Sequence, residues 1–145
     1  MFITQISVYL ENARGTLREM TKLLAENDID IMALSIADTS NFGIVRMIIR
    51  EASIDKALSC MKNAGFMFKK TNVICVGVPN KPGALDNILA VVEEADVSIE
   101  YIYSFNYSVD GDALFVLRLL DSERVIELFK ERNIKMYSQE EINRL

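Results

Sequence analysis

Hydrophobic and polar residues alternate at the start of the chain, and the pattern then changes to a helical spacing. In residues 3–10 the apolar side chains of Ile6, Val8 and Leu10 fall on one side, as they do in a half-buried strand. After Gly15 the apolar positions stand three and four residues apart, which is typical of an amphipathic helix. The sequence therefore predicts a strand, a tight turn and a helix.

The first half of the chain continues with further strands and a second helix. Three strands are predicted, at residues 29–37, 42–50 and 66–68. The polar residues 38–41, between the first two of these strands, fit the loop of a hairpin. The second helix is expected to begin at Ser53, whose hydroxyl suits an N-cap, and to end at Gly65, which can adopt the left-handed conformation that ends helices.

The whole series of elements recurs 68 residues further along the chain. Strands are predicted at 73–78, 97–105 and 113–120, and helices after Gly83 and after Asp121 or Ser122. Asn133 stands at the position equivalent to Gly65, and Asn is second only to Gly in left-handed helix caps. Ser138, with Glu141 three residues later, forms a capping-box pattern that predicts a short C-terminal helix.

The repeated order of strand, helix, strand, strand, helix, strand predicts an α+β chain of two domains, at residues 1–70 and 71–145. Units of this size bury a small core, so we expect the two halves to share a buried surface. The joint at residues 69–72 contains no Gly, Ser or Pro, so the last strand of the first half is expected to run almost directly into the next strand. The two halves are therefore expected to pack rigidly.

Composition narrows the range of functions. The net charge of −5 over 145 residues disfavours binding to a nucleic-acid backbone. The chain contains no His, which removes the commonest general base and the commonest metal ligand. Cys60 and Cys75 form no metal or redox motif, and no phosphate-binding loop is present. We therefore expect no catalysis, no cofactor and no bound metal.

An aromatic stripe at Tyr101, Tyr103, Phe105 and Tyr107 raises the alternative of base stacking. The basic residues that accompany such a stripe in RNA-binding sheets are missing, so packing against another sheet or helix is the better interpretation. The N-terminus has no signal-peptide pattern, and no run of 18 apolar residues occurs. We expect a cytoplasmic protein with neither nucleic acid nor membrane as a partner.

Two short motifs at the strand-to-helix turns point to a family. Residues 79–85 read PNKPGAL and residues 11–17 read ENARGTL, with Arg14 where Pro82 stands. The first motif resembles the equivalent turn of the ACT domain, and the second is a weaker copy of it. The resemblance covers both halves and is closest in kind to stand-alone tandem ACT proteins, which carry no catalytic domain. It implies two ferredoxin-like units whose antiparallel sheets carry helices on one face and join side by side.

The resemblance also implies an amino acid or related small molecule as the ligand of these turns. The unpaired N–H groups that begin a helix suit a carboxylate, and Gly15 and Gly83 let a ligand approach the backbone. Asn12 and Asn80 offer a carbonyl oxygen to an ammonium group. In ACT families the second strand of a neighbouring unit completes the site. The expected ligand-binding residues are Asn12, Arg14, Gly15, Thr16, Leu17, Ser35, Asn80, Lys81, Pro82, Gly83, Ala84, Leu85, Tyr103 and Ser104.

Other interpretations stay open at this point. Both turns are also explained by local structure alone, with Gly for the bend and Asn for an Asx-turn. A detached regulatory subunit of an amino-acid metabolic enzyme, similar to the small subunit of acetolactate synthase, would use the same fold as an interaction module without a ligand of its own. The first expectation is a non-catalytic regulatory sensor that forms a homodimer and binds a small amino acid or an analogue. A partner enzyme is a further possible binding partner.

Overall fold

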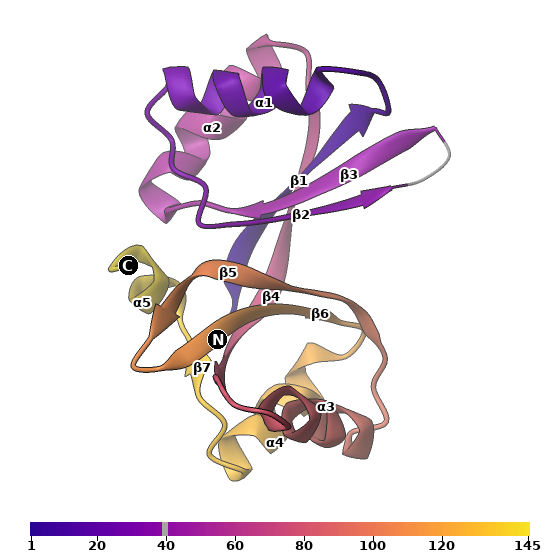
Figure 1. The fold of residues 1–145 in the computed structure, drawn as a ribbon, viewed down its shortest axis with the longest axis vertical. Coiled ribbons are helices and arrows are strands. Elements are labelled where there is room, and N and C mark those ends of the chain that lie inside the picture. Colours follow the sequence, from indigo (N-terminus) through magenta and orange to yellow (C-terminus); the bar gives the residue numbers. More distant parts are fainter. Residues whose placement is uncertain (39–40) are drawn as a thin grey trace. The chain divides into compact units, whose positions relative to one another are not determined.

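A computed structural model describes residues 1–38 and 41–145, so Thr39 and Ser40 of the predicted hairpin loop lie outside the described residues. The described chain divides into two compact units (Figure 1). We refer to Thr4–Thr71 as the N-terminal unit. The C-terminal unit consists of Asn72–Leu145 together with Met1–Ile3.

The N-terminal unit is an antiparallel sheet covered by two helices. Its elements are β1 (Ile3–Glu11), α1 (Thr16–Glu26), β2 (Ala33–Asp38), β3 (Phe42–Ile48), α2 (Glu51–Asn63) and the start of β4 (Met67–Pro79). The strand β3 pairs with β1 on one side and with β2 on the other, so Val45 lies opposite both Val8 and Ile36. The strand β4 pairs with β1. Both helices lie over the same face of the sheet (Figure 1).

The core of the N-terminal unit confirms the alternation that predicts its first strand. Ile6, Val8 and Leu10 of β1 are at most 6% exposed and pack in one cluster with the buried residues of both helices. Because successive side chains of a strand point to opposite faces, these three residues lie on the face that the helices cover. Met20 and Met61, one from each helix, are completely buried in the same cluster.

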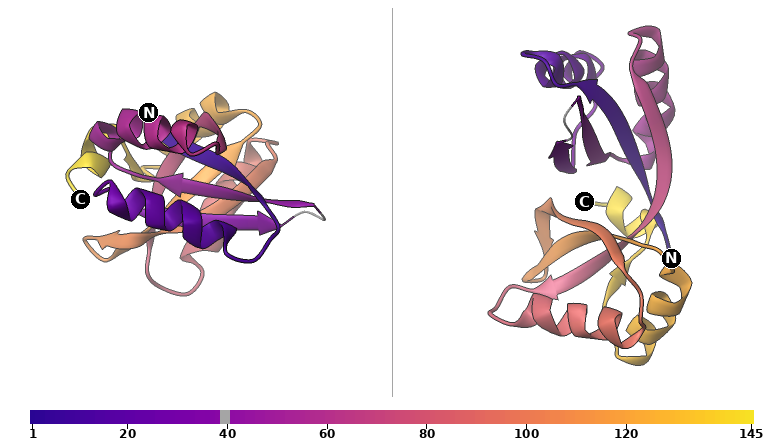
Figure 2. Two further views of the ribbon diagram at one scale, coloured as in Figure 1. Left: turned by 90° about the horizontal axis from the view of Figure 1, so that it is seen from above. Right: turned by 90° about the vertical axis from the view of Figure 1, so that its right-hand side faces the viewer.

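The C-terminal unit repeats this plan. Its elements after β4 are α3 (Ala84–Glu94), β5 (Ile99–Val109), β6 (Asp112–Leu119), α4 (Ser122–Glu131), β7 (Met136–Tyr137) and α5 (Gln139–Asn143). The strand β6 lies between β4 and β5, and β7 pairs with the other edge of β4. The turned views in Figure 2 show α3 and α4 side by side over this sheet.

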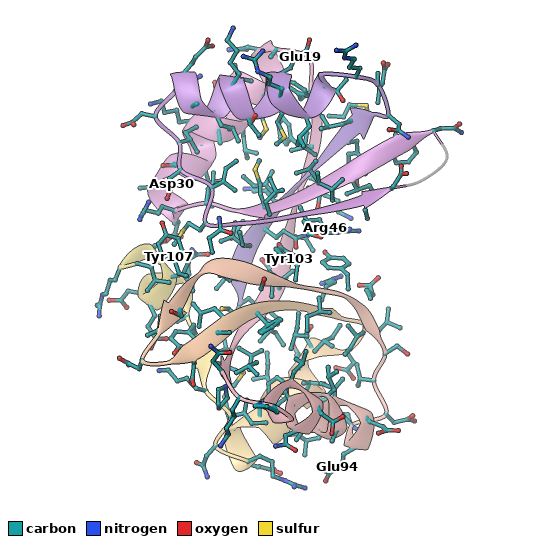
Figure 3. All side chains as sticks on the ribbon, viewed as in Figure 1. Glu19, Asp30, Arg46, Glu94, Tyr103 and Tyr107 are labelled. Carbon is teal, nitrogen blue, oxygen red and sulfur yellow. The ribbon has the colours of Figure 1, made fainter. Side chains whose placement is uncertain are left out.

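Residues of both helices, α3 and α4, cover the core of the C-terminal unit. Phe129 of α4 is completely buried among the apolar residues of β4, β6 and α3. Arg132, just beyond α4, donates hydrogen bonds of 2.6 and 2.8 Å to the carboxylate of Glu94 at the end of α3 (Glu94 is labelled in Figure 3). On the opposite face of β4, burial raises the pKa of the Cys75 thiol, which keeps this cysteine protonated and poorly nucleophilic.

Helix ends are predicted better than helix starts. Gly65 (φ 83°) and Asn133 (φ 55°) adopt the left-handed conformation after α2 and α4, as predicted from their repeat positions. The prediction that Ser53 caps α2 is wrong, because the helix begins at Glu51 with Arg50 as its N-cap. The N–H of Ser53 instead donates to the carbonyl oxygen of Arg50 at 2.9 Å, so this residue already lies inside the first turn. Asp121, one of two candidates, is the N-cap of α4, and its carboxylate accepts from the N–H of Arg124 at 3.3 Å.

The strand limits also differ from the prediction: the strand predicted at 97–105 is Ile99–Val109, the one predicted at 42–50 ends at Ile48, and two larger differences concern β2 and β4. The segment predicted as a strand from residue 29 enters β2 only at Ala33, because residues 27–29 first close the end of α1 with Asp28 in a left-handed conformation. The strands predicted at 66–68 and 73–78 are one continuous strand of 13 residues, β4. The last strand of one repeat therefore continues directly into the first strand of the next. The predicted side-by-side joining of the two sheets stays a prediction.

The short C-terminal helix α5 has the capping box that its sequence predicts. The Ser138 hydroxyl accepts from the N–H of Glu141 at 3.3 Å, and the Glu141 carboxylate accepts from the N–H of Ser138 at 2.8 Å. The Lys135 ammonium also donates to Glu141 at 2.8 Å. The hydrogen bond from Lys135, followed by that from the Ser138 backbone, lowers the pKa of the Glu141 carboxyl group.

This lowered pKa predicts a pH-dependent contribution of Glu141 to stability. A carboxylate with a lowered pKa in the folded state stabilises the fold above its unfolded pKa, about 4.3, and loses this effect as the pH falls through the folded value. Glu141→Ala should lower the free energy of unfolding at pH 7 by about 1 kcal/mol, the usual value of a helix cap, because it removes both the capping hydrogen bond from Ser138 and the partner of Lys135. The difference from the wild type should shrink as the pH falls below about 4, as measured by urea unfolding at a series of pH values.

Glu140→Ala is the matched control, because Glu140 carries the same charge on the same helix and, among the described residues, forms an ion pair with exposed Arg144 alone. Its effect at pH 7 should be a few tenths of a kcal/mol. Equal effects of the two substitutions at every pH would contradict the assigned role of Glu141.

Candidate functional site

The turn after β1 has the conformation that its glycine permits. Gly15 has φ 88° and precedes α1 directly, so the chain reverses within four residues of the end of the strand. The Thr16 hydroxyl donates to the carbonyl oxygens of Glu11 at 2.9 Å and Ala13 at 3.0 Å, which fixes the turn from inside. A Cβ at Gly15 would meet no atom within 4 Å. The glycine is therefore required by the backbone conformation and not by protein packing, and the space above it is open.

A cavity of about 410 Å³ opens beside this turn and lies wholly within the N-terminal unit. We call it the loop cavity. Its apolar lining comes from the sheet and from α1, and consists of Leu10, Leu17, Ile36 and Val45. Its polar and small lining residues are Glu11, Asn12, Ala13, Gly15, Thr16, Arg18, Asp38 and Gly43. The loop cavity thus combines an apolar floor with a polar rim, as small-molecule sites commonly do.

The polar rim contains groups of both charges. The Asn12 amide donates to the Asp38 carboxylate at 3.4 Å, which joins the turn to the end of β2. Asp38 and Glu11 supply negative charge, while Arg18 and the first turn of α1 supply positive potential. An ammonium group and a carboxylate can therefore both find a complementary partner within this cavity.

The predicted residues of the N-terminal unit divide into two groups. Asn12, Gly15, Thr16 and Leu17 line the loop cavity. Arg14 is exposed and lies outside its lining. Ser35 lies on the other face of β2, opposite Arg46, and its predicted role in completing the site of a neighbouring unit stays a prediction (Arg46 is labelled in Figure 3).

Sequence reasoning missed the contribution of the second strand to this cavity. Ile36 and Asp38 line it, because they share a face of β2 with Leu34, which packs on the helix-covered core. The signal was present in the alternation of the strand, where Ile36 and Asp38 have the opposite parity to Ser35. Arg18 was missed as well, since its position on the helix surface has no distinguishing pattern.

The turn of the C-terminal unit has the same backbone geometry. Gly83 has φ 84° and precedes α3, and a Cβ there would meet no atom within 4 Å. The N–H of Ala84 donates to the carbonyl oxygen of Lys81 at 3.2 Å, and the N–H of Asn80 to that of Gly111 at 3.3 Å. The first hydrogen bond closes the turn itself, and the second holds the turn against the hairpin between β5 and β6.

The hollow beside this second turn faces residues 133–135, whereas the loop cavity beside the first turn faces β2 and β3. It has a volume of about 300 Å³ and includes Lys81 and Ala84 of the predicted set. Leu85 is half-buried and packs on the core, while Asn80, Pro82 and Gly83 are exposed and lie outside its lining. On β5, Tyr103 is 8% exposed and Ser104 is exposed opposite Phe115, and neither lines this hollow (Tyr103 is labelled in Figure 3).

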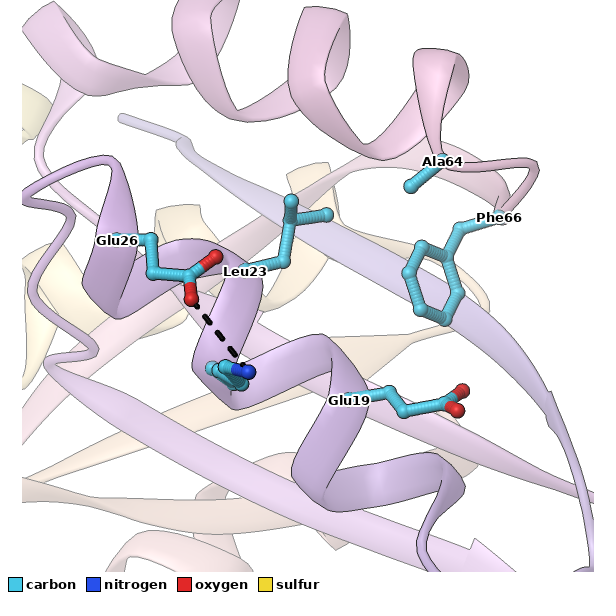
Figure 4. Close-up of a pocket in the computed structure, with 6 residues that line it drawn as sticks. Glu19, Leu23, Glu26, Ala64 and Phe66 are labelled. Carbon is cyan, nitrogen blue, oxygen red and sulfur yellow. Dashed lines mark ion pairs between the residues drawn. The ribbon is translucent and has the colours of Figure 1, made fainter.

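A further hollow of about 360 Å³ lies between α1 and the end of α2 (Figure 4). Its charged lining residues are Glu19, Lys22 and Glu26, beside Leu23, Ala64 and Phe66. The Lys22 ammonium is already paired at 3.7 Å with the carboxylate of Glu26, one turn further along the same helix, so its charge is neutralised within α1. It contains none of the predicted ligand-binding residues, and we assign no ligand to it.

Two kinds of feature were not found among the described residues, a cluster of metal-ligating side chains and a membrane-spanning helix. Residues 1–38 and 41–145 contain no group of three or more His, Cys, Asp or Glu side chains that could hold a metal ion. Within the same residues, no helix has both the length and the apolar character needed to span a bilayer.

Comparison with known proteins identifies the family. Residues 1–145 match the family model described as "ACT domain pair". The chain is similar to the crystal structure of protein BT0572 from Bacteroides thetaiotaomicron, with 34% identity and a TM-score of 0.88 over 100% of this chain and 98% of that one. A search of curated proteins gave no match.

Two regulatory proteins share the fold at lower identity. The regulatory subunits of aspartate kinase from Thermus thermophilus, in ligand-free form, and from Thermus flavus are 14% and 15% identical, with TM-scores of 0.62 and 0.60. Each match covers 88% of this chain and 90% of the other, and at these identities the likeness concerns the fold alone. Together with the family match over the whole chain, the repeated α+β architecture and its two glycine turns lead to one conclusion: this chain belongs to the ACT domain pair family.

Proposed function

We propose that this protein is a non-catalytic regulatory sensor that binds a small amino acid or a related metabolite at the loops after the first strand of each unit. The observation that carries the proposal is the loop cavity, in which an apolar floor, two carboxylates and a helix start converge beside Gly15. The family consists of regulatory, ligand-binding modules of amino-acid metabolism, and the regulatory subunits of aspartate kinase have the same fold. The absence of His from the sequence supports a non-catalytic role.

The geometry of the loop cavity suits an α-amino acid in one orientation. The carboxylate of the ligand lies at the first turn of α1, near Arg18, where free N–H groups and the helix dipole favour negative charge. The ammonium group lies at the opposite rim, where the Asp38 carboxylate and the Asn12 side-chain oxygen accept hydrogen bonds. The side chain of the ligand then points toward Leu10 and Val45. This orientation favours an amino acid with an apolar side chain.

Binding at this position would add contacts between the turn after β1 and the end of β2, which β3 already links through its pairing with both strands. The turn after β1 and the end of β2 are connected by the 3.4 Å hydrogen bond between Asn12 and Asp38. A ligand that contacts both α1 and Asp38 stabilises the folded arrangement in proportion to its occupancy. Leu17 and Ile36, at the mouth of the cavity, are 36% and 50% exposed, so we propose that the second strand of a second copy covers them in a homodimer. An effect on a partner enzyme would follow from this change in the interface.

A protein-interaction module without a ligand is the second candidate. It is favoured by Tyr9 and Phe42, which are 36% and 42% exposed and form an edge-to-face ring pair at 6.3 Å. Exposed aromatic pairs of this kind are common at protein interfaces. Co-purification with a large catalytic subunit, together with no response to any amino acid, would favour this candidate.

The first prediction is a thermal shift that depends on Asp38. Thermal unfolding in the presence of each of the twenty amino acids should show an upward shift for one chemical class, with apolar side chains expected. A ligand at a hundred times its dissociation constant adds about 2.7 kcal/mol, which corresponds to several degrees for a chain of this size. Asp38→Asn should weaken binding by roughly tenfold or more, because it removes a charge-assisted hydrogen bond.

Asp55→Asn is the control for this experiment, since Asp55 is exposed on α2 and lies outside the loop cavity. It should leave the shift unchanged. If no amino acid raises the unfolding temperature of the wild-type protein, the amino-acid proposal fails and the interaction module becomes the leading candidate.

The second prediction concerns the open space above Gly15. Gly15→Asn keeps a residue that tolerates the left-handed backbone, so the protein should fold with a loss of about 1 kcal/mol. Its side chain would enter the space in which the ligand approaches, because no protein atom lies within 4 Å of the Cβ position. The amino-acid-dependent shift of the unfolding temperature should therefore lose the contribution of the loop cavity.

Gly65→Asn has the same backbone cost, with φ 83° and an equally open Cβ position, but lies outside the loop cavity. It should retain the shift in full. A shift of undiminished size in Gly15→Asn would show that the ligand does not bind over this turn.

A further inference from the structure

A hollow of about 280 Å³ lies beside the N-terminal turn, on the flank toward the start of β4, and we call it the acidic hollow. The end of β1, the first turn of α1 and the segment between α2 and β4 enclose it. Its lining residues are Tyr9, Leu10, Glu11, Thr16, Glu19, Gly65, Phe66 and Met67. Leu10, Glu11 and Thr16 also border the loop cavity, so these residues separate the two spaces.

The charged side chains of the acidic hollow are carboxylates without a cationic partner. Neither Glu11 nor Glu19 forms an ion pair with another described residue. Lys22, three residues after Glu19, is paired with Glu26 and lies outside the lining. The N-terminal unit as a whole contains slightly more basic than acidic side chains, so the negative charge of the hollow is a local feature. The hollow therefore attracts a cation and repels an anion.

The remaining lining suits the apolar body of an organic cation. Tyr9 and Phe66 supply aromatic rings, whose faces attract cations, and the Met67 thioether packs readily against methylene groups. Figure 4 shows the Glu19 side chain on the flank of α1 that faces Phe66. A bare metal ion fits less well, because residues 1–38 and 41–145 contain no group of three or more metal-ligating side chains.

The C-terminal unit has a hollow at the equivalent position, but its charges differ. Most lining positions of the acidic hollow recur 68 residues later in the lining of the hollow of about 300 Å³. There Pro79 and Asn87 stand in place of the two carboxylates, Gly77 in place of Tyr9, and Lys135 in place of the thioether. That lining contains two lysines and one carboxylate. The fold thus supplies the space in both repeats, and the local side chains set its charge.

We propose that the acidic hollow binds an organic amine that carries no carboxylate, such as an aliphatic diamine or a guanidinium-bearing amine. The cationic groups of the amine donate hydrogen bonds to the carboxylates of Glu11 and Glu19, and two carboxylates match the two charges of such a ligand. The methylene chain lies against Phe66 and Met67. An amino acid brings a carboxylate for which this lining offers no cation, so the site goes beyond the function proposed for the loop cavity and selects a different class of ligand.

Pairs of compounds that differ by one carboxylate test this selectivity. The ¹⁵N-labelled full chain is titrated by NMR with agmatine and with arginine, and with cadaverine and with lysine. Both amines should shift the backbone amide signals of Tyr9, Gly65 and Met67. At these residues each amine should bind roughly threefold or more tightly than its amino acid counterpart, as expected for charges that are partly exposed to solvent.

Two pairs of variants assign the binding to this hollow. Glu19→Gln should weaken amine binding roughly threefold or more, because it removes one of the two charges. Glu123→Gln is its control, since Glu123 is an exposed acidic residue in the first turn of α4 and lies outside the lining. Met67→Lys introduces the cation of the equivalent C-terminal position and should also weaken binding, whereas Met67→Leu keeps the apolar contact and should leave binding unchanged.

Three results would overturn the proposal. The first is the absence of amine-induced shifts at Tyr9, Gly65 and Met67. The second is equal binding of an amine and its amino acid counterpart at these residues. The third is equal weakening by Glu19→Gln and Glu123→Gln, which would attribute the attraction to the net charge of −5 and not to the hollow.

The two flanks of the turn are distinguished by residues that line only one of them. Ile36, Asp38 and Gly43 line the loop cavity but not the acidic hollow. Amine-induced shifts confined to these three residues would place the amine in the loop cavity and would also overturn the proposal. Asp38→Asn, which weakens amino-acid binding at the loop cavity, should leave amine binding at the acidic hollow unchanged.

Discussion

The left-handed backbone at Gly15 and Gly83 is the constraint on which the rest of each unit depends. In each unit the first strand buries one face because the following helix returns directly across that face. With φ near 85°, each glycine reverses the chain within four residues and starts the helix over the sheet. The apolar stripes of α1 and α3 then meet the inward-facing residues of the strands. The same turn leaves the first N–H groups of each helix without helical partners.

Cavities arise on the flanks of these turns because a helix covers a sheet incompletely near its start. In the N-terminal unit the gap toward β2 and β3 is the loop cavity, with Leu10 and Val45 as its floor. In the C-terminal unit the gap lies on the other flank, toward residues 133–135, and is the hollow of about 300 Å³ that contains Lys81 and Ala84. The chemistry of each is set by strand residues rather than by the turn itself, since Asp38 and Asp112 supply the negative charge.

The elements of the fold could be predicted from the sequence because their signals are local. The left-handed caps at Gly65 and Asn133, the capping box at Ser138 and the repeat of 68 residues each depend on residues close in the chain. The start of α2 could not, because Arg50 caps it through backbone conformation alone and leaves no side-chain pattern. The only sequence signal for the continuity of β4 was the lack of Gly, Ser and Pro at residues 69–72.

The residues of the candidate sites were harder to predict for a different reason. The turn residues Asn12, Gly15 and Thr16 belong to a local sequence motif that predicts them. Asp38 lies at the same cavity because of the register of β2 against β3. Gly77 and Asp112 are brought together by the pairing of β4 with β6. A pairing register joins residues far apart in the chain, so no local pattern records it.

The exchange of Tyr9 for Gly77 between the two repeats has a consequence for how such a protein evolves. Both residues occupy the strand parity opposite to the core residues, so a substitution there leaves the packing of Ile74, Val76 and Val78 under the helices intact. A gene duplication of this fold therefore provides positions at which selection can alter the ligand preference of a hollow. The core residues of the unit can stay the same meanwhile. The two halves of one chain can in this way acquire different chemical preferences.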